Sequence, residues 1–298
     1  MRILVLGGTG YLGRHVAERL RALPGVQLLA AGRRAAEFAV DLATDRPERL
    51  TRTLAEAAPD AVVNCAGATG GDSVTLAEVN ARGPAALCTA LREAAPTARL
   101  VHLGSAAEYG PGTPDVPVTE SAPACPVTAY GATKLAGTVA VTSAALDAVV
   151  LRVGNPVGPG APVASLPGRL AGLLRSAGRD PEAVLRLGDL SAHRDFVDVR
   201  DVARAVESAV TAPAPLPSVL NVGSGTAVPV RELALGLARQ AGFRGKLEES
   251  TGGSARSAQV SWQCSDISAA ARALGWRPAN GLDDALAALW AATVERVP

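Results

Sequence analysis

A short aliphatic run followed at once by a cluster of glycines opens the chain. Residues 2–6 read Arg-Ile-Leu-Val-Leu, which is typical of a strand buried in a parallel sheet. Gly7, Gly10 and Gly13 follow with the spacing G-x-x-G-x-x-G, and a helical pattern continues from His15. Glycine permits a tight turn and a close approach of the backbone to a pyrophosphate, whose charge is met by the helix N-terminus. This strand–turn–helix order predicts a dinucleotide-binding loop.

Beyond the glycine loop, strand-like and helical segments alternate along the chain. The runs that read as strands are Val26–Ala31, Ala61–Asn64, Leu100–Gly104, Val149–Val153 and Leu220–Val222. The segments with helical patterns are Pro47–Ala58, Gly83–Ala95, Tyr130–Leu146 and Val199–Ala212. Alternation of this kind predicts an α/β fold of the Rossmann type, a doubly wound parallel sheet whose ligands bind beyond the carboxyl ends of the strands.

The regular alternation breaks down from about residue 157 to residue 195 and again beyond about residue 226. We therefore expect two domains that are each built from discontinuous segments. Residues 1–156 and 196–226 would form the dinucleotide-binding Rossmann domain. Residues 157–195 and 227–298 would form a smaller substrate-binding cap over the active site.

Two arginines end the second predicted strand. An NAD-binding unit usually carries Asp or Glu here, which hydrogen-bonds the 2′-hydroxyl of the ribose. Arg33 and Arg34 instead favour a ligand with a 2′-phosphate, because a planar guanidinium binds phosphate through two hydrogen bonds. Arginine is common in this chain, so solvated surface charges are the alternative interpretation. We expect NADP(H) to be preferred, with NAD(H) as the alternative cofactor.

Lysine is rare in this sequence. Only two of the 298 residues are lysine, and one of them, Lys134, follows Tyr130 by four positions. On a helix this spacing places the phenol and the ammonium on one face. A phenol has a pKa of about 10, and a neighbouring positive charge lowers it. The pair therefore favours a group that donates or accepts a proton near neutral pH, whereas a surface pair without a chemical role is the alternative.

Composition argues against several other classes of protein. With a net charge of +1, scattered arginines and 3% aromatic residues, the chain has no basic stripe for nucleic acid and no attraction to an anionic membrane. The opening apolar run of about five residues is too short for a signal-peptide core or a membrane span. Four dispersed cysteines and three dispersed histidines lack the spacing of a metal site or a disulfide framework. We expect a reduced, soluble, cytoplasmic protein that binds no metal.

The glycine loop and the Tyr130/Lys134 pair together resemble those of the extended short-chain dehydrogenases/reductases, a family of nucleotide-sugar epimerases, dehydratases and ketoreductases. The resemblance covers nearly the whole chain. Its further motifs are N-x-A-G at residues 64–67, S-S-x-x-V-Y-G at 104–110, R-x-x-N-x-x-G-P-G at 152–160, R-D-F-V-H-V at 194–199, N-v-G-s-G at 221–225 and the substrate-domain ending at 256–278.

The resemblance implies roles for particular residues. Ser105, Tyr130 and Lys134 would be the catalytic residues. The cofactor would be bound by Gly7, Gly10, Tyr11, Leu12, Gly13, Arg33, Arg34, Asp41, Leu42, Cys65, Ala66, Gly67, Asn80, Tyr130 and Lys134. The nucleotide-sugar substrate would be bound by Ser105, Asn155, Arg194 and Arg256. Taken singly, each of these arginines also fits a surface ion pair.

The chemistry implied by the resemblance is carbonyl reduction. The ketone oxygen would lie between the hydroxyls of Ser105 and Tyr130, and Tyr130 would donate the proton while the nicotinamide delivers hydride. Family members that catalyse 4,6-dehydration carry Asp-Glu directly after the catalytic hydroxyl. This chain has Ala106 and Ala107 there, which transfer no protons, so we do not expect that elimination.

We expect an NADPH-dependent reductase of a nucleotide-linked 4-keto-deoxyhexose, with dTDP as the nucleotide, in deoxysugar or antibiotic biosynthesis. This preference rests on Arg33 and Arg34, because an epimerase restores its cofactor in every turnover and gains nothing from NADPH. An NAD-dependent nucleotide-sugar epimerase is the alternative. A non-catalytic NADP-binding sensor is a third reading, which the retained catalytic residues disfavour. Family members pair the helices at 83–95 and 130–146 across a four-helix interface, so we also expect a homodimer.

Overall fold

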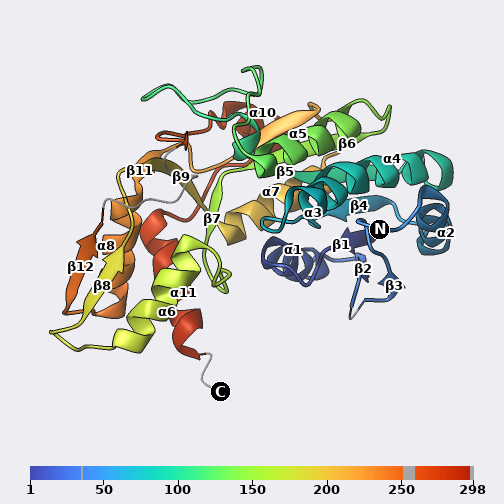
Figure 1. The fold of residues 1–298 in the computed structure, drawn as a ribbon. Helices are drawn as coiled ribbons and strands as arrows, with labels where there is room; N and C mark the ends of the chain where they lie inside the picture. The colour runs from blue at the N-terminus through green and yellow to red at the C-terminus, as the bar shows by residue number, and fades with distance from the viewer. Residues whose placement is uncertain (35, 251–258, 296–298) are drawn as a thin grey trace.

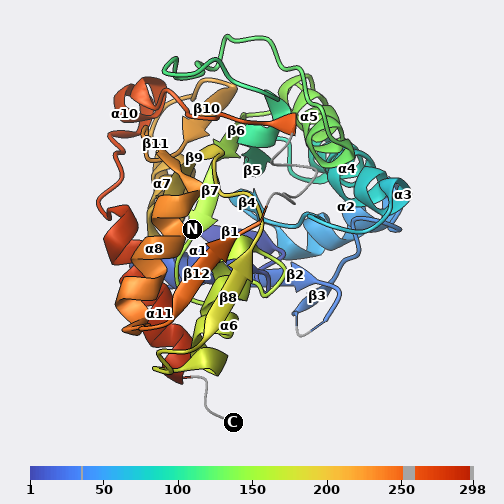
Figure 2. The same cartoon turned by 60° about the vertical axis from the view of Figure 1, so that its left-hand side comes forward.

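The sheet at the centre of the molecule is parallel throughout. The computed structural model describes residues 1–34, 36–250 and 259–295. Seven strands lie in the order β10-β6-β5-β4-β1-β2-β3 (Figures 1 and 2). Each neighbouring pair in this order is parallel. The strand bounds are β1 Arg2–Leu6, β2 Gln27–Gly32, β3 Phe38–Ala39, β4 Ala61–Asn64, β5 Arg99–Ser105, β6 Ala148–Val153 and β10 Val219–Val222.

Helices cover both faces of this sheet (Figure 2). The helices of one face are α1 Tyr11–Arg21, α7 Val199–Thr211 and α10 Ser268–Leu274, and those of the other face are α2 Pro47–Ala57, α4 Gly83–Ala94 and α5 Ala129–Thr142. Successive side chains of a strand point to opposite faces, so Leu4 packs in one apolar core and Val5 in the other. The predicted doubly wound fold of the Rossmann type is confirmed.

Short helical turns follow two of the central strands at their carboxyl ends. β5 leads directly into a 3-10 turn, η2 (Ala106–Glu108). After β4 the chain passes through α3 (Ser73–Ala77) and a π-helical turn, η1 (Glu78–Arg82), before α4 begins. Ligands of open parallel sheets bind at this edge, so these turns lie where a site is expected.

Helix α5 is shorter than the sequence pattern predicts. It begins after Thr128, whose hydroxyl caps its first turn, and it ends at Thr142 rather than at residue 146. Ser143 donates its hydroxyl to a carbonyl one turn back, at 2.5 Å, and Ala145 has a φ of 53°. A side chain that bonds to the backbone and a left-handed residue both stop a helix. The alanine-rich composition of the segment conceals these two local signals.

A second group of elements encloses a separate apolar core, at the lower left of Figure 1. Three strands form a small sheet in the order β11-β9-β7, and two more, β12 and β8, pair with each other. Leu170 of α6, Leu233 of α8 and Leu286 of α11 meet in the core. The bounds are β7 Asn155–Val157, β8 Val184–Leu187, β9 His193–Asp198, β11 Ala227–Pro229, β12 Lys246–Glu249, α6 Leu166–Ala177, α8 Val230–Ala241 and α11 Leu282–Glu295.

Part of the predicted cap packs with the central sheet instead. Within residues 227–298, α10 and Trp276 belong to the core beneath α7. The indole N–H of Trp276 donates to the carbonyl of Asp201 at 3.0 Å. The Asp201 carboxylate accepts the backbone N–H groups of Ala279 and Asn280 at 3.0 and 2.9 Å. These bonds anchor the segment after α10 to α7, and the division into two domains stays a prediction.

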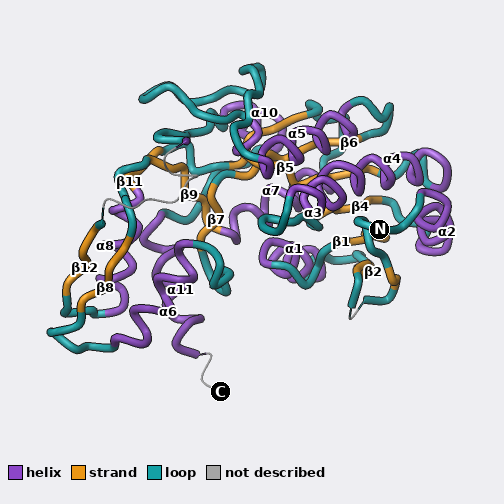
Figure 3. The backbone as a smooth tube through the Cα atoms, in the orientation of Figure 1, coloured by secondary structure: helices purple, strands orange, loops and turns teal. Residues whose placement is uncertain are grey.

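A long loop between η2 and α5 crosses the top of the molecule in Figure 3. Its backbone pairs with a segment from much later in the chain: the N–H of Gly112 donates to the carbonyl of Trp262 at 3.0 Å, and that of Val118 to Cys264 at 2.8 Å. Gln263, between these two partners, donates its side-chain amide to the carbonyl of Ala106 at 2.7 Å. The later segment therefore lies against the carboxyl end of β5.

Within residues 1–34, 36–250 and 259–295, no helix combines the length and apolar character needed to cross a membrane. In the same residues, no group of three His, Cys, Asp or Glu side chains is arranged to hold a metal ion. Cys65, Cys88, Cys125 and Cys264 are free thiols.

Candidate active site

The glycine loop forms a tight turn between β1 and α1. The N–H of Gly10 donates to the carbonyl of Gly7 at 3.0 Å, and Gly7 has a φ of 74°. A Cβ on Gly7 would come within 2.7 Å of the backbone of Ala66, at the end of β4. Helix α1 begins after Gly10, and no described side chain caps it. The N–H groups of its first turn, Tyr11 to Gly13, are therefore left for an anion at this helix end.

The same helix is tied to the loop Gly158–Gly160, which follows β7. The Tyr11 hydroxyl donates to the carbonyl of Gly158 at 3.4 Å. The Nε2 atom of His15 lies 2.9 Å from the carbonyl oxygen of Pro159. Arg14 donates to the carbonyl of Gly160. The guanidinium carbon of Arg14 also lies over the Tyr11 ring, 5.5 Å from its centroid. Burial, together with the charge of Asp198, raises the pKa of the Tyr11 phenol above its ordinary value. The Tyr11 side chain is thus used to join α1 to this loop, while its backbone belongs to the uncapped first turn.

Arg33 and Arg34 lie just beyond β2, the strand beside β1. Leu6 pairs with Ala31, so the carboxyl ends of both strands meet at one edge. The N–H of Gly7 donates to the carbonyl of Ala31 at 3.3 Å, which joins the glycine loop to β2. Both arginine side chains are exposed. Their contact with the 2′ position of a bound adenosine ribose stays a prediction.

Asp41 and Leu42 belong to a hydrogen-bonded loop after β3. The N–H of Asp41 donates to the carboxylate of Asp45 at 2.8 Å. Arg82 holds the loop from η1 by donating to the carbonyls of Leu42 and Asp45 at 3.2 and 2.9 Å. Leu42 is buried against Gly83, where a Cβ would come within 2.9 Å of it. The close packing of α4 on this loop sets its position relative to the sheet.

The turn after β4 is held by Asn80, which lies on η1. Its side-chain amide accepts the N–H of Ala68 and donates to the carbonyl of the same residue, both at 2.9 Å. A Cβ on Gly67 would lie 3.5 Å from the Asn80 amide oxygen and 4.0 Å from the Lys134 ammonium nitrogen. Burial raises the pKa of the Cys65 thiol to about 12, against the opposing effect of Lys134. These predicted cofactor-binding residues therefore converge on Lys134.

Ser105 ends β5 and caps η2. Its hydroxyl oxygen accepts the N–H of Ala107 at 3.2 Å, and its backbone N–H donates to Oε1 of Glu108 at 2.7 Å. The residue is 7% exposed. Since the oxygen acts as an acceptor in its bond to Ala107, the hydroxyl hydrogen is available to a ligand oxygen.

Tyr130 and Lys134 lie one turn apart near the start of α5. Tyr130 is half-buried, whereas Lys134 is 4% exposed. The ammonium of Lys134 donates to the carbonyl of Leu103 on β5. Burial lowers the pKa of Lys134 to about 8, and the charge of Glu108 opposes that shift. Lys134 is therefore largely charged at neutral pH and loses its charge only slightly above it.

Glu108 is a fully buried carboxylate that sequence patterns did not reveal. Its Oε2 atom accepts the Thr138 hydroxyl at 2.8 Å and the Arg152 Nε–H at 2.7 Å. The Arg152 guanidinium also lies over the ring of Tyr109, 4.4 Å from its centroid. One signal could have identified this residue: an ionisable side chain stands where the S-S-x-x-V-Y-G motif has valine.

His102 is a second buried polar residue that sequence reasoning missed. Its Nδ1 atom lies 3.1 Å from the side-chain nitrogen of Asn64, and its Nε2 atom has no partner among the described residues. Burial and the nearby charge of Lys134 lower the pKa of the ring well below its usual value, so it is neutral. The side-chain oxygen of Asn64 accepts the N–H of Ala66 at 3.1 Å and shapes the turn after β4.

Two of the predicted substrate-binding residues, Asn155 and Arg194, lie on the adjacent strands β7 and β9. Asn155 donates its side-chain amide to the carbonyl of Asp195 at 3.2 Å. Arg194 is 6% exposed, and one of its guanidinium N–H groups donates to the carbonyl of His193 at 2.7 Å. The structure thus brings Asn155 and Arg194 to one small sheet. Arg256 lies outside the described residues.

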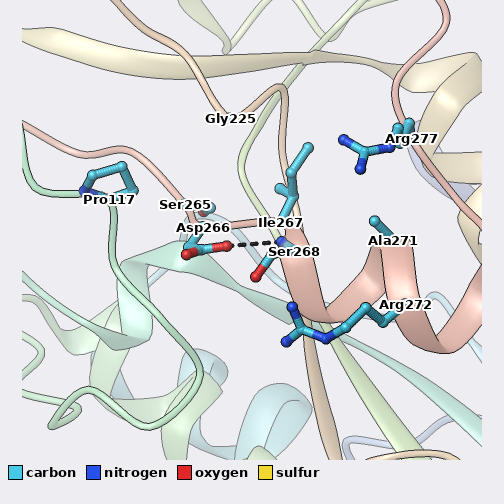
Figure 4. A pocket seen from close by; sticks show the side chains of 9 residues that line it. All are labelled: Pro117, Gly225, Ser265, Asp266, Ile267, Ser268, Ala271, Arg272 and Arg277. Carbon is cyan, nitrogen blue, oxygen red and sulfur yellow. Dashed lines mark hydrogen bonds between the residues drawn. The ribbon is translucent and has the colours of Figure 1, made fainter.

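A surface hollow of about 360 Å³ lies beside α10 (Figure 4). Figure 4 shows the carboxylate of Asp266 bonded to the backbone N–H of Ser268, at 2.8 Å, at the start of that helix. None of the predicted catalytic or cofactor-binding residues is among those that line it: Pro117, Gly225, Ser265, Asp266, Ile267, Ser268, Ala271, Arg272 and Arg277. We therefore place the candidate active site at the carboxyl edge of β1, β4 and β5.

Residues 3–223 match the NAD dependent epimerase/dehydratase family. The chain belongs to this family. The matched region runs from β1 to the end of β10 and contains the glycine loop, Ser105, Tyr130 and Lys134. The predicted family is confirmed, and so is the prediction of an NAD(P)-dependent enzyme of this class.

Relatives of the chain include enzymes of nucleotide sugars. It is 39% identical over 304 residues to dTDP-6-deoxy-L-talose 4-dehydrogenase (NAD(P)(+)) of Kitasatospora kifunensis, with 98% of this chain and 95% of that protein covered. It is 34% identical over 157 residues to dTDP-4-dehydrorhamnose reductase of Burkholderia thailandensis, with 51% of this chain and 49% of that protein covered. Among solved structures, MoeE5 in complex with UDP-glucuronic acid and NAD aligns over the whole length of both chains, with a TM-score of 0.87 and 26% identity.

Proposed function

We propose that this protein uses NADPH to reduce the keto group of a nucleotide-linked 4-keto-deoxyhexose, with dTDP as the nucleotide, in deoxysugar or antibiotic biosynthesis. The observation that carries the proposal is the nearly full-length likeness to a protein named as a dTDP-deoxyhexose 4-dehydrogenase. Dehydrogenation of a 4-hydroxyl is the reverse of reduction of a 4-ketone. An active site that stabilises the shared transition state serves both directions.

Three residues would carry out the proton chemistry. The Ser105 hydroxyl and the Tyr130 phenol donate hydrogen bonds to the ketone oxygen, and Tyr130 gives up its proton as the alcohol forms. Lys134 stabilises the phenolate that remains, because its ammonium is charged and buried beside β5. Solvent then returns the proton to Tyr130. Ala107 contacts the Ser105 hydroxyl only through its backbone N–H. Its side chain transfers no proton, which agrees with reduction rather than elimination.

The described residues fit a dinucleotide. When bound, NADPH supplies the hydride that the reduction requires. The uncapped N-terminus of α1 suits a pyrophosphate, and the exposed Arg33 and Arg34 suit a 2′-phosphate. Lys134, which lies beside Gly67, would donate to a ribose hydroxyl. Asn155, Arg194 and Arg256 would contact the diphosphate of the sugar nucleotide.

We also propose that the protein is a homodimer joined through α4 and α5. The outer face of α5 presents an exposed apolar stripe at helical spacing, formed by Ala129, Ala132, Ala136 and Val139. Small apolar side chains allow two helices to pack closely. Light scattering should give a mass close to twice 30.1 kDa, and Val139→Glu should convert the protein to the monomer. A wild-type monomer would rule the dimer out.

The reaction is tested by mixing purified protein with NADPH and a freshly generated dTDP-4-keto-6-deoxyhexose. We expect nicotinamide absorbance to fall. The amount of NADPH oxidised should equal the amount of dTDP-linked 4-hydroxy sugar that forms. Tyr130→Phe should bind NADPH as the wild type does and turn over about a hundredfold more slowly.

Two other results would overturn the proposal. A changed sugar with NADPH intact would identify a nucleotide-sugar epimerase. Turnover that Tyr130→Phe leaves unaffected would refute the Ser/Tyr/Lys mechanism.

A further inference from the structure

The Glu108 carboxylate joins three elements beneath the candidate active site. It accepts the backbone N–H of Ser105 on one oxygen, at 2.7 Å. The other oxygen accepts the Thr138 hydroxyl at 2.8 Å and the Arg152 Nε–H at 2.7 Å. The residue is 0% exposed, so all of its hydrogen-bonding capacity is directed at protein groups. A carboxylate with three donors in such surroundings is held in one orientation.

Two of these donors lie on the two elements that carry the predicted catalytic residues. Ser105 ends β5, whereas Thr138 lies on α5 one turn beyond Lys134. Gly104 leaves room for the carboxylate, because a Cβ there would lie 2.8 Å from Oε1 of Glu108. Glu108 therefore sets the distance between the strand that carries Ser105 and the helix that carries Lys134.

Glu108 is also the negative charge that faces Lys134. Cys65, from the end of β4, and His102, from β5, are titratable groups that also face this ammonium, and Tyr130 lies one turn earlier on α5. Burial raises the pKa of Cys65 to about 12 and lowers the pKa of His102 well below its usual value, so both are neutral at neutral pH. Burial likewise lowers the pKa of Lys134, to about 8, and the charge of Glu108 opposes that change.

We propose that Glu108 is a positioning residue of the active site, whose carboxylate holds Ser105 against α5 and keeps the Lys134 ammonium charged. This inference rests on the proposed function for the catalytic role of Lys134. It adds a residue that acts through Ser105 and Lys134 without contact with the substrate.

The charge of Lys134 can be measured without any substrate. The chain has only two lysines, Lys134 and the exposed Lys246 on β12, so protein labelled with 13C-lysine gives two side-chain signals to titrate. In Glu108→Gln the Lys134 signal should titrate roughly one pH unit lower than in the wild type, because an opposite charge has been removed. Thr138→Val keeps the carboxylate and should leave the titration unchanged. A Lys134 signal that titrates alike in Glu108→Gln and the wild type would overturn the inference.

Kinetics supply a second readout that separates positioning from folding. With NADPH and the dTDP-4-keto sugar, Glu108→Gln should lower kcat by about tenfold or more, leave KM within about twofold, and move the alkaline fall in rate to lower pH. A kcat and a pH profile equal to those of the wild type would refute the positioning role. If the wild type itself reduces no substrate, the proposed function fails, and the NMR titration still decides whether Glu108 controls Lys134.

Glu108→Gln leaves the buried Arg152 without its carboxylate, which is strongly destabilising when a buried pair loses one partner. The double variant Glu108→Gln/Arg152→Met removes both charges and avoids an unpaired buried cation. Its Lys134 signal should also titrate at lower pH than the wild-type signal. An unchanged titration in the folded double variant would contradict the inference.

Discussion

Gly13 packs directly on the turn made by Gly7: a Cβ on Gly13 would lie 2.0 Å from the Gly7 carbonyl oxygen. Gly13→Ala must therefore push α1 away from the turn. We expect a loss of about 1–3 kcal/mol in the free energy of unfolding, together with loss of NADPH binding. Thermal unfolding and fluorescence titration with NADPH measure the two effects.

Gly8→Ala is the matched control for that variant. A Cβ on Gly8 would meet its nearest neighbours at 3.7 and 4.0 Å, which is ordinary contact. This variant should keep wild-type stability, and it should weaken NADPH binding only if the cofactor approaches Gly8 closely. A Gly13→Ala protein with the stability of the wild type would show that α1 can shift without cost.

Arg33 and Arg34 should determine the choice of cofactor. The double variant Arg33→Ala/Arg34→Ala should raise the KM for NADPH by about tenfold or more and leave that for NADH nearly unchanged, because only NADPH carries the 2′-phosphate. Arg21→Ala, an exposed arginine in the last turn of α1, is the control for a general loss of positive charge. An equal effect on the two cofactors would mean that the two arginines are surface charges.

The pH dependence of turnover should follow Lys134. Its pKa of about 8 means that the ammonium is charged below that pH and loses its charge as the pH rises through it. The positive charge that assists Tyr130 is therefore present at pH 7 and lost by about pH 9. We expect kcat for reduction to fall through this range, and Lys134→Met to be slow at every pH. A wild-type rate that stays constant from pH 7 to pH 9.5, with the fold intact by circular dichroism, would count against this role.

Asp195 should be required for the stability of the turn after β10. Its buried carboxylate accepts both the N–H and the hydroxyl of Ser224, at 2.6 and 2.7 Å, and the N–H of Ser265 at 3.1 Å. Asp195→Asn places an amide NH₂ among these donors and should cost about 1–3 kcal/mol at pH 7. Denaturant unfolding measures this loss in the free energy of unfolding. The control Asp283→Asn, at an exposed ion pair with Arg239, should change the free energy of unfolding little. Equal stability of both variants would mean that the turn does not depend on this carboxylate.

Much of the fold could be predicted because its signals are local. The run Ala61–Asn64 was predicted as a strand and forms β4 with the same bounds, since a strand buried on both faces reads as continuous apolar sequence. The glycine loop was recognised by its spacing, and the turn that it forms requires close approach of the backbone at Gly7. The end of α5 was predicted four residues too late, because nothing in an alanine-rich segment marks where the hydroxyl of Ser143 bonds back to the helix.

The site was predicted only in part, for a different reason. Tyr130 and Lys134 were recognisable from their spacing, but the bond from Lys134 to the carbonyl of Leu103 depends on how α5 packs against β5. The sequence also contained no sign that Tyr11 would be drawn to the loop after β7. That contact joins residues 147 positions apart.

By itself the sequence determined six of the seven strands of the central sheet, the glycine turn and the helix that places Lys134 one turn after Tyr130. These features depend on residues within a few positions of each other, so pattern and spacing suffice to recognise them. The tertiary structure alone decided the partners of the buried charges. Glu108 meets Thr138 and Arg152, which are 30 and 44 positions away, where β5, β6 and α5 come together. A carboxylate removed from water must find donors wherever the packed elements supply them, and no local pattern encodes where those are.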